Sequence, residues 1–243
     1  MFSVALIGPD GAGKTSLTAQ LTRCCKVPVK CLYMGINMEA SDHALPTSRL
    51  VEYLKRRQEA RSRAHGRVDD SSSAGKSSKL GLGGWVWAIC RLMNRLLEEW
   101  YRQLLSWSYQ LRGYAVVYDR HFLFDFTLDG IDGEHQPADK RLHRWFLEHC
   151  YPRPSVTIYL DAPAELLFAR KGEKTLEELE RRRQAFLRLG QKVKNFFRID
   201  ATRPFDVVYA DVSRVVEHGY RNTRRDAGRG LRFRLQRLGK LFD

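Results

Sequence analysis

The feature that most limits what this chain can fold into is a glycine-rich segment close to its start. Its first and last glycines enclose four residues and are followed by Lys and Thr, which is the pattern of a phosphate-binding loop. Glycines let the backbone curl with its N–H groups pointing inward, where they surround a polyphosphate. The apolar run from Phe2 to Ile7 leads directly into this segment, Gly8-Pro9-Asp10-Gly11-Ala12-Gly13-Lys14-Thr15. The sequence therefore predicts a strand, a nucleotide-binding loop and a helix, in that order.

Each residue type in the segment has its own chemical task. Lys14 supplies a mobile positive charge for the β- and γ-phosphates, and the hydroxyl of Thr15 can ligate Mg²⁺. The helix expected from about Lys14 points the positive end of its dipole toward the same anion. A glycine-rich turn that matches the pattern by accident is the alternative. On the first interpretation, the nucleotide-binding residues are Gly8, Pro9, Asp10, Gly11, Ala12, Gly13, Lys14, Thr15 and Ser16.

Length and cysteine content set the class of protein. The 243 residues are enough for one large α/β domain with a substantial core, or for two small domains. The five cysteines lack the spacing of metal ligands, which suits a reducing compartment. No basic leader precedes the first strand, so we expect no secretory signal and a cytoplasmic location.

The net charge of +14 raises the possibility of a nucleic-acid partner, so its distribution matters. Residues 55–79 carry eight Lys or Arg against three acids, and residues 221–243 carry eight against two. These two segments hold most of the excess, which leaves the rest of the chain close to balance. The chain has no DNA- or RNA-reading motif and no Asn-Lys-x-Asp segment of a GTP-binding switch. Nucleic acid is therefore a minor alternative.

Short β-rich runs alternate with longer helical patterns, which indicates parallel strands joined by crossover helices. The alternation predicts an α/β fold in which helices flank the sheet. The strands expected are 2–7, 29–33, 114–119, 155–160 and 196–200. The helices expected are 14–24, 47–60, 84–111, 138–149, 163–170, 176–194 and 204–218. Thr175 with Glu178 forms a capping box, and Gly219 suits a helix C-terminus.

Two segments stand outside this alternation. Residues 61–84 are rich in Ser and Gly, so we expect a flexible insertion. The aromatic-rich helix after it, 84–111, contains charged residues that argue against a membrane span. It is expected to be buried or to form a dimer interface, and a ligand-lining role for part of it is an open alternative. The tail, 221–243, is basic and amphipathic, with apolar positions at Leu231, Leu235, Leu238 and Phe242. A helix on an anionic membrane surface, a helix packed on the domain and a frayed end are all open for it.

A second chemical segment is the apolar run that ends in Asp119-Arg120-His121. In an open α/β sheet, ligands bind beyond the carboxyl ends of the strands, so Asp119 is expected near the glycine-rich loop. Asp119 can order Mg²⁺ or orient an acceptor, and Arg120 can clamp phosphate oxygens with its planar fork. A loop-capping Asp and a surface ion pair are the alternatives. His121 is expected to orient or pack rather than to transfer a proton.

A third segment supplies further cations. The strand ending near Leu160-Asp161 leads into a helix that reaches Arg170, and a lid is expected at 171–175. Phosphoryl transfer needs mobile cations around the transferring group, and Arg170 fits this task. The run Arg181-Arg182-Arg183 is either part of that set or a solvated helix face.

These three segments together resemble the thymidylate kinase family, and more generally nucleoside monophosphate kinases. The resemblance implies a P-loop fold of three layers with a five-stranded parallel sheet, often in a homodimer. It implies that Asp10 lies near the acceptor or the metal and that Arg120 contacts the acceptor phosphate. The stretch Tyr33 to Ala40 departs from the Thr-Arg-Glu-Pro-Gly-Gly-like loop that the family has there. The donor side is therefore better specified than the acceptor.

The resulting hypothesis is an ATP- and Mg²⁺-dependent kinase domain over residues 1–220, followed by the basic tail. It moves the γ-phosphoryl group of ATP to a small acceptor, a nucleoside monophosphate such as dTMP or a related molecule. Thr15 and Asp119 are expected to hold the metal. The catalytic set expected is Lys14, Asp10, Asp119, Arg120 and Arg170. The alternative is a regulatory nucleotide-binding protein that contacts nucleic acid or a membrane surface through its basic segments.

Overall fold

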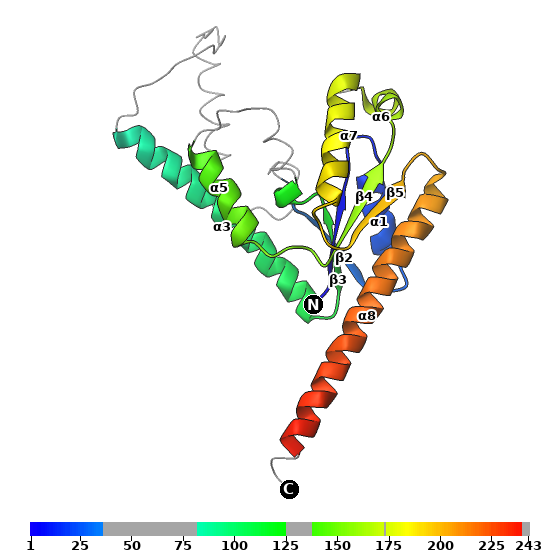
Figure 1. Cartoon of the computed structure of the whole chain (residues 1–243). Helices are drawn as coiled ribbons and strands as arrows, with labels where there is room; N and C mark the ends of the chain where they lie inside the picture. Colours follow the sequence, from blue (N-terminus) through cyan, green and yellow to red (C-terminus); the bar gives the residue numbers. More distant parts are fainter. Residues whose placement is uncertain (36–81, 125–137, 173, 240–243) are drawn as a thin grey trace, which may run out of the picture.

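The architecture is a parallel β-sheet covered by helices on both faces (Figure 1). The computed structural model describes residues 1–35, 82–124, 138–172 and 174–239. Five parallel strands form the sheet in the order β2-β3-β1-β4-β5. Their bounds are β1 (Ser3–Ile7), β2 (Val29–Tyr33), β3 (Ala115–Asp119), β4 (Val156–Asp161) and β5 (Phe196–Asp200). The predicted α/β fold and its five-stranded parallel sheet are confirmed, and each strand lies within one residue of its expected bounds.

The strands follow from their composition. The three central strands, β1, β3 and β4, are buried along their whole length. Strands covered on both faces must be apolar at successive positions, and β-branched and aromatic residues favour the extended backbone. The outer strand β5 instead exposes three of its five residues, as its edge position requires.

The sheet separates two hydrophobic cores, one on each of its faces, and helices cover both. On one face, α1 and α8 cover the side chains of Val4, Leu6 and Ile158. On the other face, α3, α5 and α7 cover Ala5 and Tyr159, which point the opposite way along the same strands. The helices are α1 (Lys14–Cys24), α3 (Leu82–Leu111), α5 (Ala138–His149), α6 (Ala164–Lys171), α7 (Leu176–Gly190) and α8 (Phe205–Gly239).

Most helix predictions agree with these bounds. The expected helices 14–24 and 138–149 are confirmed in full, whereas the expected helix 47–60 lies outside the described residues. Residues 61–81 of the expected insertion also lie outside them, and residues 82–84 belong to α3. The helix predicted over 176–194 ends earlier, at Gly190, where a Cβ atom would lie 2.5 Å from the Phe196 ring. Among the described helices, none is long and apolar enough to cross a lipid bilayer.

The prediction that a helix ends at Gly219 is wrong, because α8 continues through it to Gly239. Gly219 serves close packing instead. A Cβ atom there would lie 2.6 Å from the Phe2 ring, which packs on α8 at this point. A helix-interior glycine costs about 1 kcal/mol relative to alanine, whereas overpacking costs about 1–3 kcal/mol, so glycine is the better residue here. Sequence spacing alone does not distinguish a glycine that ends a helix from one that admits a neighbouring ring.

Candidate active site

The glycine-rich segment forms a loop between the carboxyl end of β1 and the start of α1. Gly13 is the N-cap residue of α1, and it has a left-handed backbone with φ of 86°. Gly8 and Gly11 also have positive φ values, 154° and 87°. A Cβ atom on Gly8 would lie 2.8 Å from the carbonyl oxygen of Leu160, so neighbouring β4 also requires glycine. At Gly13, by contrast, a Cβ atom would meet no atom within 4 Å, so this side of the loop is open.

Lys14 places a buried ammonium group against this loop. Its side chain is only 6% exposed. Its Nζ atom donates hydrogen bonds to the carbonyl oxygens of Gly8 at 2.8 Å and Pro9 at 2.7 Å. The first turn of α1 contains no acidic residue, so the positive end of the helix dipole adds to the charge of Lys14. The loop therefore has the positive charge and the helix terminus that suit an anion.

Thr15 and Asp119 come together at the same edge of the sheet. Strand β3 pairs with β1 so that Asp119 stands opposite Leu6, one residue before the end of β1. The Thr15 hydroxyl then donates to Oδ2 of Asp119 over 3.2 Å. A hydroxyl and a carboxylate are hard oxygen ligands that fit Mg²⁺, which usually takes one or two carboxylates together with phosphate oxygens. Within the described residues, no cluster of three or more His, Cys, Asp or Glu could hold a metal ion.

Asp10 and Arg120 form an ion pair between the glycine-rich loop and the end of β3. Arg120 has a left-handed backbone, with φ of 68°, and its N–H donates to the carbonyl of Leu6 at 3.2 Å. This turn directs the guanidinium across the end of β1. Burial raises the pKa of Asp10, but the charges of Arg120, Lys14 and Lys171 outweigh it, and the pKa lies below its usual 3.8. Asp10 is therefore a carboxylate surrounded by cations.

Arg170 lies beside the loop and ties it to a second segment. Its guanidinium donates to the carbonyl of Gly11 at 3.4 Å and, through both terminal nitrogens, to the carbonyl of Ala201 at 3.3 Å. Ala201 belongs to the connection between β5 and α8. Arg170 thus bridges two loops at the carboxyl edge of the sheet. Its expected task of neutralising a transferring phosphoryl group stays a prediction.

The expected lid follows α6 as a short connection. The C-cap residue of α6 is Gly172, in a left-handed conformation with φ of 66°. At the other end, Thr175 caps α7 by accepting a hydrogen bond from the N–H of Glu178, as the capping box predicts. The Glu178 carboxylate binds Lys174 at 2.9 Å. Glu173 lies outside the described residues, and the movement implied by a lid stays a prediction.

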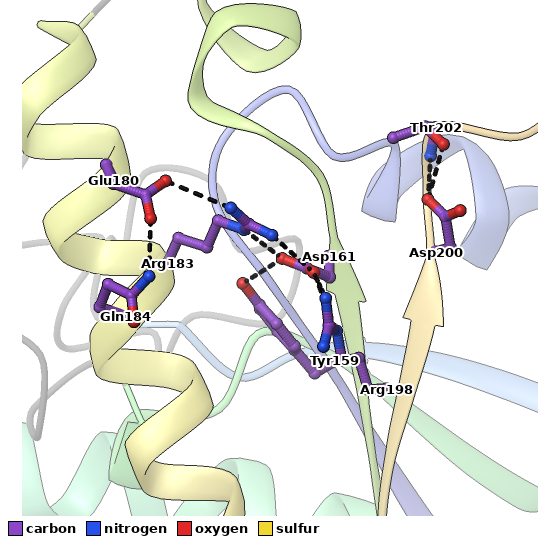
Figure 2. A network of polar contacts seen from close by, with 8 residues as sticks. All are labelled: Tyr159, Asp161, Glu180, Arg183, Gln184, Arg198, Asp200 and Thr202. Atoms are coloured by element: carbon purple, nitrogen blue, oxygen red, sulfur yellow. Dashed lines mark hydrogen bonds and ion pairs between the residues drawn. The ribbon is translucent and has the colours of Figure 1, made fainter.

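A polar cluster that sequence reasoning did not assemble surrounds Asp161 at the end of β4 (Figure 2). Its Oδ1 atom accepts from Arg183 Nε at 2.7 Å and from the Tyr159 hydroxyl at 3.2 Å. Its Oδ2 atom accepts from Arg183 at 3.2 Å and from Nε of Arg198 at 2.9 Å. Arg183 is the member of the arginine run that points at the sheet, while Arg182 pairs with Glu178 on the surface of α7. One buried carboxylate therefore joins β4, β5 and α7.

A second polar cluster lies between α3 and α5. The Arg102 guanidinium, 1% exposed, pairs with Glu98 at 3.1 Å and donates to the carbonyl of Gly35 at 3.2 Å. The next residue after Glu98, Glu99, forms a hydrogen bond with Nε2 of His143 at 2.8 Å. Alternating aromatic and charged residues had indicated a buried helix or an interface here, but the register that buries these charges is not readable from one sequence. Part of α3 is thus held by buried polar and charged side chains as well as apolar contacts.

His121, next to Arg120, belongs to the core. Its ring is fully buried and lies 5.4 Å from the Tyr118 ring and 5.5 Å from the Phe124 ring. Burial lowers its pKa to about 3, so the imidazole is neutral at physiological pH. Packing rather than proton transfer is the role this position supports, in line with the expectation.

The Asp161 cluster yields a stability prediction. Replacing Asp161 by asparagine is expected to lower the free energy of unfolding by about 2 kcal/mol. This loss is smaller than that from breaking a fully buried ion pair, because the Arg198 side chain is 56% exposed. Asp211→Asn is the matched control. It also removes a carboxylate bound by two arginines, but that side chain is 29% exposed, so about 0.5 kcal/mol is expected. Urea unfolding followed by circular dichroism measures both, and equal losses would contradict the structural role of Asp161.

The same carboxylate sets an acid limit. Burial raises the pKa of Asp161, but hydrogen bonds and charge from Arg183 and Arg198 outweigh it and hold the pKa below 3.8. A depressed pKa in the folded state gives stability that is present above the unfolded value and lost as pH falls through the folded value. The stability difference between the protein and Asp161→Asn is therefore expected to shrink below about pH 4.

Comparison with known proteins agrees with this architecture. No protein-family model matches the chain. A deoxyadenosine kinase from M. mycoides, solved with bound dATP, matches 88% of this chain and 98% of its own with a TM-score of 0.51 and 14% identity. The same protein with dCMP and dCDP gives a TM-score of 0.51 at 13% identity over 89% of this chain. These likenesses show the fold.

Sequence relatives are closer. A "Thymidylate kinase" of Thermosipho africanus is 33% identical over 72 residues, 26% of this chain and 36% of that protein. A "Probable thymidylate kinase" of Archaeoglobus fulgidus is 30% identical over 112 residues, 43% of this chain and 54% of that protein. These two matches span less than two thirds of the relatives' lengths. Another, from Staphylothermus marinus, is 30% identical over 226 residues, 89% of this chain and 96% of that protein. The chain belongs to the thymidylate kinase family.

Proposed function

We propose that this protein is a Mg²⁺-dependent nucleotide kinase that transfers the γ-phosphoryl group of ATP to a nucleoside monophosphate. The observation that carries the proposal is the meeting of three groups at one edge of the sheet. These are the glycine-rich loop with Lys14, the Thr15–Asp119 pair and the Asp10–Arg120 ion pair. The first two suit a bound nucleoside triphosphate, and the third provides a guanidinium for a second phosphate. The kinase names of the relatives support the same conclusion.

In this proposal, the loop and Lys14 bind the donor. The N–H groups of the loop and of the first turn of α1 surround the β- and γ-phosphates. The Lys14 ammonium exchanges a carbonyl partner for a phosphate oxygen and stabilises negative charge on the transferring group. An acceptor phosphate oxygen attacks the γ-phosphorus while the bond from that phosphorus to the β–γ bridging oxygen breaks, so ADP leaves. Little covalent work falls to the protein, because positioning and electrostatics lower the barrier.

Thr15 and Asp119 are proposed to hold Mg²⁺, directly or through water. When bound, the ion neutralises charge on the phosphates of the donor. The two side chains are joined by a hydrogen bond of 3.2 Å, so both are close enough to bind one ion. Asp119 has the hard carboxylate oxygens that this ion prefers.

Arg120 is proposed to clamp the acceptor phosphate, and Asp10 to orient that arginine. A terminal nitrogen of Arg120 forms the ion pair with Asp10, and the arginine side chain is 33% exposed. A planar guanidinium can bind two phosphate oxygens at once, so a partly exposed arginine at this edge of the sheet suits a dianionic phosphate. We take dTMP as the first acceptor to test, followed by other nucleoside monophosphates, nucleosides and sugars, with ADP release as the signal. ATP binding without ADP release for every acceptor would favour the regulatory alternative.

We further propose a homodimer that buries an apolar stripe on α3. Five large side chains on α3 are at least 38% exposed and recur every three or four residues, so they share one helix face: Ile89, Met93, Leu97, Tyr101 and Leu104. A contiguous apolar face of this kind marks an interaction site, and two copies would cover one another. The aromatic-rich helix was expected to be buried or to form an interface, and these exposures favour the interface.

Light scattering after gel filtration tests the dimer. Leu97→Glu, at 57% exposure, is expected to shift the protein from dimer to monomer, because two facing carboxylates would be buried without partners. Leu176→Glu is the control, since this apolar residue is 45% exposed and lies at the start of a different helix, α7. A monomeric wild-type protein, or an unchanged dimer in Leu97→Glu, would contradict the proposal.

A further inference from the structure

Helix α8 extends well past the part that packs on the sheet. Its Tyr220 hydroxyl donates to the carbonyl of Gly113 at 2.5 Å, and the Arg224 guanidinium lies over the Tyr220 ring, 5.2 Å from its centroid. The helix then continues to Gly239, about 22 Å farther at 1.5 Å per residue. Figure 1 shows this C-terminal part projecting beyond the sheet, away from the other helices and strands. The body therefore anchors only the first half of the helix.

The projecting part has a distinctive charge and pattern. Residues 221–239 contain seven arginines and one acid, Asp226, a net charge of +6. Three leucines, Leu231, Leu235 and Leu238, stand four and three residues apart, so an α-helix places them on one face. The positions of Arg232 and Arg234 flank that face at 100° per residue. A narrow apolar stripe with basic flanks is the pattern of a helix that lies in a membrane interface.

We propose that residues 221–239 of α8 bind the surface of an anionic lipid membrane and hold the body of the protein against it. The leucines enter the headgroup boundary, and the arginines reach phosphate and carboxylate groups of the lipids with their long side chains. This inference uses none of the residues assigned to phosphoryl transfer, so it stands or falls independently of the proposed kinase activity.

Two other partners fit the helix less well. Nucleic acid would use the arginines, but phosphate contacts give no reason for three leucines on one face. A second copy of α8 could cover the leucines, but it would bring two helices of charge +6 together, at a large repulsive cost. Gly228 and Gly230 also weaken the helix by themselves, which suits a segment that gains stability when it lies on a surface.

Vesicle sedimentation with the full-length protein tests the inference. Vesicles of phosphatidylcholine with 30% phosphatidylserine provide the anionic surface, and pure phosphatidylcholine provides the neutral one. The protein is expected to sediment with the anionic vesicles and not with the neutral ones, and to be released as salt rises from about 0.1 to 0.5 M. Each arginine near the surface contributes about a five-fold change in the partition coefficient.

Two matched variants localise the effect. Arg229, Arg232, Arg234 and Arg237 are replaced together by Gln in the tail variant, which is expected to lose about 600-fold in partition, the product of four such contributions. The body variant removes the same number of charges at exposed positions elsewhere: Arg153, Lys192, Lys194 and Arg214. It is expected to keep nearly all of the binding. Thermal unfolding at midpoints close to the wild-type value shows that both variants fold.

A third variant separates the apolar contribution from charge. Leu231, Leu235 and Leu238 changed together to Ser are expected to lower partition at least ten-fold with every charge retained. Sedimentation that persists in the tail variant would overturn the inference, as would an absence of sedimentation by the wild-type protein. An unchanged leucine variant, accompanied by salt-sensitive binding to a DNA duplex, would assign the helix to nucleic acid instead.

Discussion

Replacing Lys14 by alanine is expected to lower kcat for phosphoryl transfer by about 10²- to 10³-fold, the cost of removing one preorganised charge from a developing anion. Lys14 is the cation held within the glycine-rich loop, 6% exposed and bonded to two loop carbonyls. The variant loses charge where the γ-phosphoryl group is proposed to transfer, and it also weakens ATP binding. Initial rates of ADP formation, together with ATP titration by calorimetry, measure the two effects separately.

Lys26→Ala is the matched control for this substitution. Lys26 is exposed just after α1, at the opposite end of the helix from the glycine-rich loop. It is expected to keep the wild-type kcat and affinity for ATP. If Lys14→Ala retained nucleotide binding and transfer, the proposed role of the loop would be wrong.

Replacing Arg120 by alanine is expected to lower kcat/KM for the acceptor by about 10³-fold, close to 4 kcal/mol of transition-state stabilisation. The guanidinium is proposed to hold the acceptor phosphate in two places, and its loss leaves Asp10 as an uncompensated carboxylate near the incoming anion. The KM for the acceptor should rise, while that for ATP changes little. Steady-state kinetics with each substrate varied in turn separates these outcomes.

Arg120→Lys sharpens the test because it keeps the charge and removes the planar fork. A single ammonium cannot bind two phosphate oxygens in the same geometry, so most of the loss should remain. Arg153→Ala, at an exposed position before β4, serves as the control for a general loss of positive charge. An Arg120→Ala variant in which only the KM for ATP rises would place this arginine on the donor side.

Local patterns were sufficient to predict the sheet and the strand–loop–helix geometry around the glycine-rich segment. The strands are short, mostly apolar runs bounded by turn residues, and the loop has fixed spacing. Both can therefore be identified from residues that are neighbours in the sequence. The approach of Thr15 to Asp119 followed from a general rule, because parallel strands bring their carboxyl ends to one edge. The structure adds that Asp10 and Arg120 pair with each other, which neither residue indicates alone.

What the sequence could not predict depends on contacts between distant segments. Asp161, Arg183 and Arg198 lie on three different elements, and only the register of β4 with β5 and the packing of α7 bring them together. Gly219 resembles a helix terminator until the Phe2 ring is seen against it. The buried Glu98–Arg102 pair is likewise invisible in the sequence, because α3 buries these charges while it exposes an apolar stripe. In each case, tertiary packing outweighed the local signal.

The most direct test of phosphoryl transfer at this site is to follow the γ-phosphoryl group itself. Phosphorus NMR of the protein with ATP, Mg²⁺ and dTMP, then with each other nucleoside monophosphate in turn, distinguishes a nucleoside diphosphate product from inorganic phosphate. The proposal predicts that at least one acceptor gains the γ-phosphoryl group in a one-to-one ratio with ADP, and that Lys14→Ala forms both products at least about 100-fold more slowly. Inorganic phosphate as the sole product, or no turnover with ATP bound, would contradict it.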